Sequence, residues 1–437
     1  MTQQPQSLIG MAKIMRLAFT GDNLSELTSE LVGRVAASGS DAAALLDLSI
    51  VHQLNGQREM ALDLQWQALQ QQQHYRIKSN PFRPAVRVLA IMGPGEVMAN
   101  TPIEFLVENC DIALEMLYVG AGLPLVHDIP KHDVAFVAVC ESDSNQQLLR
   151  QLQAVMSYWP HPHINRPQQI AKLARDGLCD YLSGIDGVEV VTSRRVSRDE
   201  LREQARMWPD APSSDSALSD HPATSHAGHA MWLDAPSSAP AWIVRPANSH
   251  AGHGLVRIET ATELEDYLTV QPEEEFSMAP FIDYRSQQDG LYRKYRVASV
   301  SGKAYPAHMA LSPRWMVHYL NADMVENADN RAAEAHFMDT FDWEFGARHS
   351  AALAAIDARI GLDYYSIDCG ETADGRLLVF EIDSGAVVHS MDPVELFPYK
   401  QPHMQKLFSA FHGLLKQTAW GKAAAPVSSA RRRRMAA

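Results

Sequence analysis

The sequence has few cysteines, and none of them lies close to another. Its 437 residues include four cysteines: Cys110, Cys140, Cys179 and Cys369. The sequence lacks a Cys-x-x-Cys pair, so the spacing excludes a disulfide framework or zinc knuckle and is typical of reduced thiols in the cytosol. Residues 1–9 contain no basic patch that leads into a long apolar run. No signal peptide is therefore predicted.

The sequence also lacks a long apolar run and an excess of positive charge. Its most apolar stretch, residues 112–126, is interrupted by Glu115, Gly120, Gly122 and Pro124, so we do not expect it to span a bilayer. The 38 Lys and Arg residues against 52 Asp and Glu residues give a net charge of −14. Such a surface repels nucleic acid and anionic membranes, and it also disfavours phosphate chemistry unless positive charge is concentrated locally. We expect a soluble, cytoplasmic protein.

The length of the chain predicts two to three domains, the first of them helical. Over residues 1–80 the apolar positions recur largely at three- and four-residue steps, as in amphipathic helices. Leu48, Gly56, Ala61 and Ala68 resemble one tetratricopeptide unit, which is a helix–turn–helix. Stacked repeats need about three units. Two interpretations therefore stay open: a hairpin packed onto the rest of the protein, or a unit that docks a peptide.

Strand and helix patterns alternate from residue 85 to residue 195. Strands are predicted at 86–92, 112–119, 134–140 and 188–192, and helices at 144–156 and 167–182. This alternation predicts an α/β sandwich with mostly parallel strands. The turn Gly93-Pro94-Gly95-Glu96 lacks the third glycine of a dinucleotide-binding loop and has an acid where pyrophosphate would lie. A structural turn is therefore favoured.

The composition changes again after residue 195. Residues 207–240 are rich in Pro, Ser, Ala, Asp and His, which predicts a flexible linker or loop. Longer strands with an antiparallel pattern follow from residue 241, then a helix near 404–419. Residues 421–437 form a basic tail, predicted to be disordered, with four consecutive arginines. The expected fold class is α/β and α+β, with several domains.

Three acids, Asp368, Glu381 and Asp383, lie on a predicted β-hairpin. If Asp374 and Gly375 form a two-residue turn, Asp368 faces Glu381 across the hairpin. Asp383 then points to the same face as Glu381, two residues away. Carboxylates this close repel one another, and a hard divalent cation, most simply Mg²⁺, neutralises them. The alternative is a set of exposed acids at strand ends, which their apolar flanks disfavour.

Basic residues accompany two other predicted strands. Arg245 ends one strand and precedes a loop of small residues, 249–254, whose backbone N–H groups could turn toward phosphate oxygens. Lys294 and Arg296 alternate along another strand and so point to one face. This pair suits a triphosphate or a carboxyl substrate, or it is a pair of solvated charges. The mixed aromatic and cationic segment 314–319 either lines an acceptor pocket or packs in the core.

In this order the segments resemble the ATP-grasp superfamily over about residues 164–393, most closely its glutathione-synthetase-like and ribosomal-protein glutamate ligase-like branch. The resemblance implies a pre-ATP-grasp α/β domain at 85–195 and a two-subdomain ATP-grasp domain at 196–420, after the tetratricopeptide-like helices. It departs from the family pattern at two positions. Arg245 stands where Lys is usual, so a planar guanidinium with several donors replaces the compact ammonium charge of lysine. Asp383 stands where Asn is usual.

The resemblance also implies the roles of individual residues. ATP would lie between the two subdomains, with one or two Mg²⁺ ions or Mn²⁺ in their place. Asp368, Glu381 and Asp383 match the metal-binding positions, and Lys294 and Arg296 match a catalytic basic pair near the phosphates and substrate. The residues implied to bind the nucleotide are Arg245, Ser249, His250, Gly252, His253, Gly254, Met278, Phe281 and Asp283.

The activity implied is that of an ATP-dependent carboxylate–amine ligase, which forms an amide or peptide bond through an acyl phosphate. Two alternatives stay open: a small-molecule kinase of the same fold, and a non-catalytic nucleotide-binding scaffold. The expected substrate is an amino acid, a peptide or a protein, with the N-terminal helices as a docking unit. Neither nucleic acid nor membrane is expected as a partner, and a homodimer is left open.

Overall fold

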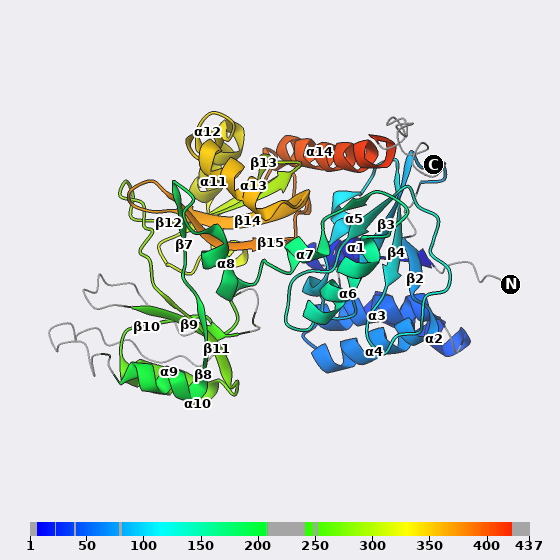
Figure 1. The fold of residues 1–437 in the computed structure, drawn as a ribbon, viewed down its shortest axis with the longest axis horizontal. Helices are drawn as coiled ribbons and strands as arrows, with labels where there is room; N and C mark the ends of the chain where they lie inside the picture. The colour runs from blue at the N-terminus through cyan, green and yellow to red at the C-terminus, as the bar shows by residue number, and fades with distance from the viewer. Residues whose placement is uncertain are drawn as a thin grey trace, which may run out of the picture.

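Three β-sheets with surrounding helices make up the described part of the chain (Figure 1). The computed structural model describes residues 7–21, 23–38, 41–77, 81–206, 208, 241–247, 249 and 252–421. The expected class, α/β and α+β with several domains, is confirmed. Apart from Trp208, the predicted linker at 207–240 lies outside the described residues, as does the predicted tail beyond residue 421. Among the helices described here, none has the length and apolar character needed to cross a membrane.

The first sheet has six strands in the order β1-β2-β4-β3-β5-β6. Their bounds are β1 Ser7–Leu8, β2 His74–Ile77, β3 Val86–Met92, β4 Ile112–Tyr118, β5 Val134–Val137 and β6 His163–Ile164. Strands β4, β3, β5 and β6 run parallel, while β2 is antiparallel to β4. The central strands are buried almost from end to end, as near-continuous apolar runs predict for parallel strands. The mostly parallel α/β unit is therefore confirmed.

The N-terminal helices belong to this sheet. Helices α1 Met11–Phe19, α2 Ser25–Ser38, α3 Ala42–Leu54 and α4 Arg58–Gln71 all lie between β1 and β2, which pair with each other. Apolar residues of α3 and α4, such as Leu46 and Leu69, share one buried core with the strands. The helical segment is thus packed onto the rest of the protein, and the boundary predicted near residue 80 does not separate its core from that of the sheet.

Two buried carboxylates hold the start of α1. Asp47 accepts hydrogen bonds from the backbone N–H groups of Ile9 and Gly10 at 2.9 and 3.1 Å, and Glu104 accepts one from Ala12 at 3.1 Å. Glu104 is only 7% exposed. Burial raises the pKa of Asp47 to about 6 and the pKa of Glu104 to about 7. Both groups therefore favour the protonated form more strongly in the folded protein than in the unfolded chain.

We expect Glu104→Gln to stabilise the protein at pH 8. The pKa of Glu104 is about 7 in the fold against an ordinary value of 4.5, so its protonation favours the fold fully below pH 4.5. That contribution is lost as the pH rises through 7, where an ionised carboxylate stays buried, whereas glutamine keeps the acceptor without charge. The variant should gain roughly 1–3 kcal/mol in the free energy of unfolding at pH 8 and nothing near pH 4.5.

Urea denaturation at both pH values measures this difference. Glu59→Gln, on the exposed first turn of α4, is the matched control and should change stability by less than about 0.5 kcal/mol. A Glu104→Gln protein no more stable than the wild type at pH 8 would show that Glu104 is not a strained buried acid.

Three short elements and two longer helices complete this region. They are η1 Val97–Ala99, α5 Ile103–Leu106, α6 Gln146–Met156, α7 Pro167–Ile170 and α8 Arg175–Leu182. The single helix predicted at 167–182 is wrong, because residues 171–174 separate α7 from α8. The strand predicted at 188–192 exists as β7 Val188–Val190, but it does not join the first sheet. It pairs with β15 of the third sheet instead.

The second sheet is small and antiparallel, with the order β10-β9-β11-β8. Its strands are β8 Arg194–Ser197, β9 Trp242–Pro246, β10 Val256–Ile258 and β11 Glu275–Pro280, and its helices are α9 Arg198–Ala205 and α10 Ala261–Val270. A core of its own, which includes Leu201, Leu264 and Phe276, lies between these helices and the strands. Ser197 and Glu200 form a capping box that starts α9.

The third sheet has the order β13-β12-β14-β15-β7. Its remaining strands are β12 Tyr292–Val300, β13 Lys303–Ser312, β14 Tyr364–Glu371 and β15 Leu377–Asp383. The other elements of this region are η2 Tyr319–Asn321, α11 Ala328–Thr340, α12 Phe345–Arg348, α13 Ser350–Ile360 and α14 Lys400–Gly421. Helix α14 runs along the top of Figure 1 and connects two sheets. The ring of Phe411 lies 5.8 Å from that of Phe136 on β5 and 5.1 Å from that of Tyr364 on β14.

Candidate active site

The hairpin of β14 and β15 pairs Asp368 with Glu381, as predicted. The predicted two-residue turn is wrong. The Thr372 N–H donates to the Arg376 carbonyl, so three residues form the loop, and Gly375 adopts a φ of +81° that favours glycine. An extra residue, Phe380, bulges from β15 and shifts the register by one. The longer loop and the bulge offset each other, and the two acids face each other after all.

Asp368 is already paired with the two basic residues predicted to be catalytic. Arg296 approaches it with a fork, at 2.7 Å from Nε to Oδ1 and 2.8 Å from Nη2 to Oδ2. The Lys294 Nζ lies 2.8 Å from Oδ2, and the Asp368 side chain is only 6% exposed. Burial alone would raise the pKa of Asp368, but Arg296 and Lys294 hold it well below its usual range. The carboxylate is therefore ionised and fully engaged.

Glu381 and Asp383 carry a different balance of charge. Glu381 Oε1 lies 2.6 Å from Nη2 of Arg175, and although burial would raise its pKa, Arg175 lowers it below the ordinary value. Asp383 accepts a 2.7 Å hydrogen bond from the Gly385 N–H. Burial and the charge of Glu381 raise the pKa of Asp383 to about 7. Of the three acids, Asp383 is the one that a nearby cation would relieve most.

These residues fit a divalent cation in part. Glu381 and Asp383 offer hard oxygen donors, and the raised pKa of Asp383 reflects its burial and the neighbouring charge of Glu381. Asp368 would have to exchange Lys294 and Arg296 for a metal. In keeping with that, no group of three or more metal-ligating side chains is assembled among the residues that the structure describes. The metal-binding role of the three acids stays a prediction.

Arg245 holds its own loop. It follows Val244 on β9, and its guanidinium donates to the Ser249 hydroxyl at 2.9 Å and also to the Ser249 carbonyl. The Ser249 hydroxyl donates in turn to the Pro246 carbonyl at 2.8 Å. Burial, together with the charge of Arg175, lowers the pKa of Arg245 to about 10. The loop is thus fixed to the end of the strand by a half-buried cation.

The loop after Ser249 requires glycine. Gly254 has a φ of +63°, and a Cβ there would lie 2.6 Å from Cδ of Pro246. Gly252 has a φ of +77°, and a Cβ would lie 3.6 Å from the sulfur of Met316. The loop therefore lies close to the segment 314–319, which comes directly after strand β13 in the chain. His253 is exposed, and His250 lies outside the described residues.

Arg175 is the residue of the site that the sequence did not indicate. It begins α8, and it binds both Glu381 on the third sheet and the Ser249 carbonyl beside the second sheet, at 2.6 and 3.1 Å. One guanidinium therefore joins the two sheets at the point where the acids and the loop meet. A lone arginine 206 positions before Glu381 carries no local signal of this role.

Three of the residues implied to bind the nucleotide, Met278, Phe281 and Asp283, have other contacts. Met278 is buried in the core of the second sheet. The ring of Phe281 lies 5.9 Å from that of Trp315, with the Arg257 guanidinium 4.4 Å from its centre. Asp283 accepts hydrogen bonds from Arg285. Phe281 thus lies beside the segment 314–319, whereas no interaction described here joins Met278 or Asp283 to the cluster of cations and acids.

Comparisons with known proteins give only distant likenesses. No family model matches the sequence, and no curated protein matches it. Among solved structures, it is similar to a D-alanine–D-alanine ligase from Bacillus anthracis complexed with ATP, with 13% identity over 77% of this chain and 99% of that one and a TM-score of 0.43. A D-alanine–D-alanine ligase from Coxiella burnetii has 9% identity over 77% and 97%, with a TM-score of 0.45. The VanG D-Ala:D-Ser ligase from Enterococcus faecalis has 12% identity over 75% and 99%, with a TM-score of 0.42.

Proposed function

We propose that this protein is an ATP-dependent carboxylate–amine ligase of the ATP-grasp type. The observation that carries the proposal is the meeting of four cations and three acids between the second and third sheets. The cations are Arg175, Arg245, Lys294 and Arg296, and the acids are Asp368, Glu381 and Asp383. With all seven ionised the net charge is four minus three, or +1. This local excess of positive charge suits a triphosphate in a protein that is acidic as a whole.

The side chains of the site have distinct roles in this proposal. Lys294 and Arg296 hold the transferred phosphate and neutralise charge as it develops on its oxygens. Arg245 orients the loop that covers the phosphates, and Arg175 keeps the two sheets together while the substrates react. Glu381 and Asp383 would hold Mg²⁺, and Asp368 would join them after losing its cations. Mg²⁺, when bound, would neutralise charge on the phosphates.

The reaction proposed has two steps. A carboxylate oxygen of the acid attacks the γ-phosphorus of ATP, which gives an acyl phosphate and ADP. An amine then attacks the acyl carbon, an amide forms, and phosphate leaves. The segment 314–319 is the proposed acceptor region, because Trp315 contacts Phe281 and Met316 lies close to Gly252. We place the reaction in the cytoplasm, with an amino acid, a peptide or a protein as the substrate.

A second candidate, a nucleotide-binding scaffold without catalysis, is favoured by one observation. Asp368 is engaged by two cations, so it is not available to a metal in this arrangement. A screen of amino acids and peptides with Mg-ATP, read by phosphate release and by the mass of the product, separates the candidates. A ligase releases phosphate and forms a product lighter by one water than its two substrates together. A kinase leaves the phosphate on the product, and a scaffold binds ATP without turnover.

We expect Arg175→Gln to raise the KM for ATP about ten- to a hundredfold. The substitution removes hydrogen bonds of a cation to Glu381 and to the Ser249 carbonyl, and hydrogen bonds to charged groups contribute about 1.5–3 kcal/mol each. In this proposal Arg175 positions the two sheets that enclose ATP and does not itself contact the transferred phosphate. The value of kcat should therefore fall less than the KM for ATP rises. Steady-state kinetics with varied ATP measures both constants.

Arg194→Gln is the matched control for this experiment. Arg194 lies on β8 of the second sheet, and its guanidinium binds only Gln204 among the contacts described here. Its removal should leave the KM for ATP unchanged. Equal effects of the two substitutions would show that Arg175 has no special place in the nucleotide site.

A further inference from the structure

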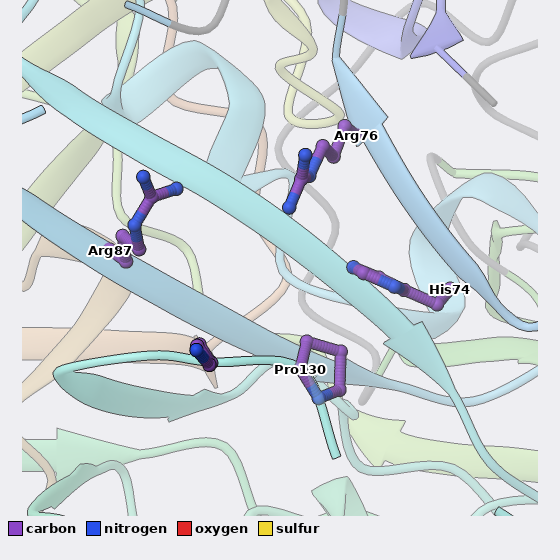
Figure 2. Close-up of a pocket in the computed structure, with 5 residues that line it drawn as sticks. His74, Arg76, Arg87 and Pro130 are labelled. Atoms are coloured by element: carbon purple, nitrogen blue, oxygen red, sulfur yellow. The ribbon is translucent and has the colours of Figure 1, made fainter. Parts of the chain in front are cut away.

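A second cluster of positive charge lies on the first sheet, apart from the candidate active site. Strand β4 lies between β2 and β3. His74 and Arg76 extend from β2, and Arg87 extends from β3, all toward β4 (Figure 2). Together with Pro130 and Lys131 they line a cavity of about 270 Å³. None of the seven charged residues of the candidate active site lines this cavity.

A buried acid organises these cations. Glu115 on β4 is only 1% exposed and faces Arg76 in the register of the two strands. Its Oε2 lies 2.6 Å from Nε2 of His74 and 2.8 Å from Nε of Arg76, and its Oε1 lies 3.7 Å from Nη1 of Arg87. Burial raises the pKa of Glu115, but His74 and Arg76 lower it below its ordinary value. The carboxylate is therefore ionised and aims the three side chains at one place.

The cations exceed the acids that contact them. Arg76, Arg87 and Lys131 against Glu115 give a charge of three minus one, or +2, with His74 neutral. Asp133 at the rim accepts a hydrogen bond from the Arg87 backbone N–H and reduces this charge to +1. Within the described part of the chain, only Nε of the Arg76 guanidinium donates to a protein acceptor, and the side chain of Lys131 has no partner. Several N–H donors thus remain for a ligand.

We propose that this pocket binds the phosphate group of a small molecule. Planar guanidinium forks bind phosphate through paired hydrogen bonds, and a phosphate group offers more acceptor oxygens to the remaining N–H donors than a single carboxylate does. The volume of about 270 Å³ lies just below the usual range for small-molecule pockets, about 300–1,000 Å³, so the ligand is compact. Arg87 is the second residue of the parallel strand β3, so the pocket lies toward the amino end of that strand. The site does not depend on the proposed ligase activity.

Binding of inorganic phosphate to the full-length protein tests this site, with isothermal titration calorimetry at low ionic strength. Arg87→Gln should weaken phosphate binding by roughly tenfold or more, and Lys131→Gln by a smaller factor. The side chains of Arg87 and Lys131 both reach the surface, so we expect both variants to fold. Lys131 lies on an exposed loop, so Lys131→Gln should disturb the fold less than Arg87→Gln does. Arg83→Gln, which removes the same charge from a nearby exposed position outside the pocket, should leave the affinity unchanged.

Two further arms locate the binding and identify its chemistry. Lys294→Met, in the candidate active site, should retain the phosphate affinity that Arg87→Gln removes. Succinate, a dicarboxylate of similar charge, should bind more weakly than phosphate. The proposal is overturned if Arg87→Gln and Arg83→Gln have equal effects, or if Lys294→Met alone abolishes binding. It is also overturned if succinate or an acidic peptide binds and phosphate does not.

Discussion

Glu381→Gln is expected to reduce ATP turnover by about a hundred- to a thousandfold. Glu381 faces Asp368 across the hairpin, neighbours Asp383 on the same face of β15, and pairs with Arg175 at 2.6 Å. Glutamine keeps the size of the side chain but removes the charge that a metal requires and that Arg175 balances. The loss should appear mainly in kcat, because the proposed metal neutralises charge that develops during phosphate transfer. Phosphate release under saturating Mg-ATP measures it.

A neighbouring glutamate provides the matched control. Glu189 lies on β7, directly beside β15, and pairs with Arg376 at the surface. Glu189→Gln removes the same charge from the same sheet without touching the candidate site, so its turnover should equal that of the wild type. The thermal unfolding of both variants shows whether the fold is kept. A folded Glu381→Gln protein with more than about a tenth of the wild-type activity contradicts the assignment of Glu381.

Arg296→Met is expected to destabilise the protein by about 3 kcal/mol. Removal of one partner from a buried ion pair costs roughly 3–5 kcal/mol, since the remaining charge stays buried. Asp368 is 6% exposed at its side chain and would keep only Lys294, which places the loss at the lower end of that range. The pKa of Asp368 is held well below its usual range, so this stabilisation is present at neutral pH and is lost only in acid, as the pH falls through that lowered value.

Urea denaturation at pH 7 measures the effect, and two further variants interpret it. Arg293→Met lies on the same strand, where Arg293 pairs with the more exposed Asp289, and should cost less than about 1 kcal/mol. The double variant Arg296→Met/Asp368→Asn also removes the buried carboxylate that Lys294 alone would still pair. Because Lys294 is 25% exposed and Asp368 only 6%, the double variant should be more stable than Arg296→Met alone. If the double variant is the less stable of the two, the buried charge of Asp368 is not the cause of the loss.

The sequence predicted the strands with strong apolar patterns and the helices between them. Val86–Met92 and Leu377–Asp383 lie where expected because alternation and apolar runs are local signals. Strands β1 and β2 have two and four residues, too few for a pattern, so their pairing around the N-terminal helices could not be foreseen. The hairpin prediction was correct for Asp368 and Glu381 only because two departures of one residue cancel.

The candidate site was predicted as a set of residues, but its contacts were not. Lys294 and Arg296 were expected near phosphate, and they bind Asp368 because β12 pairs with β14, with Arg296 opposite Asp368. That pairing joins segments about 70 positions apart, and no local pattern specifies its register. Arg175 was missed for the same reason, since its role depends on the approach of two sheets rather than on its neighbours in the chain.

The acyl-phosphate mechanism is tested most directly by the fate of the carboxylate oxygen. An acid substrate found in the phosphate-release screen is labelled with ¹⁸O in its carboxyl group and converted with Mg-ATP and the amine. In the proposed reaction one carboxylate oxygen bridges carbon and phosphorus and leaves with phosphate when the amine attacks. Mass spectrometry should therefore find one ¹⁸O atom in each phosphate released. Amide formation with unlabelled phosphate would contradict the account.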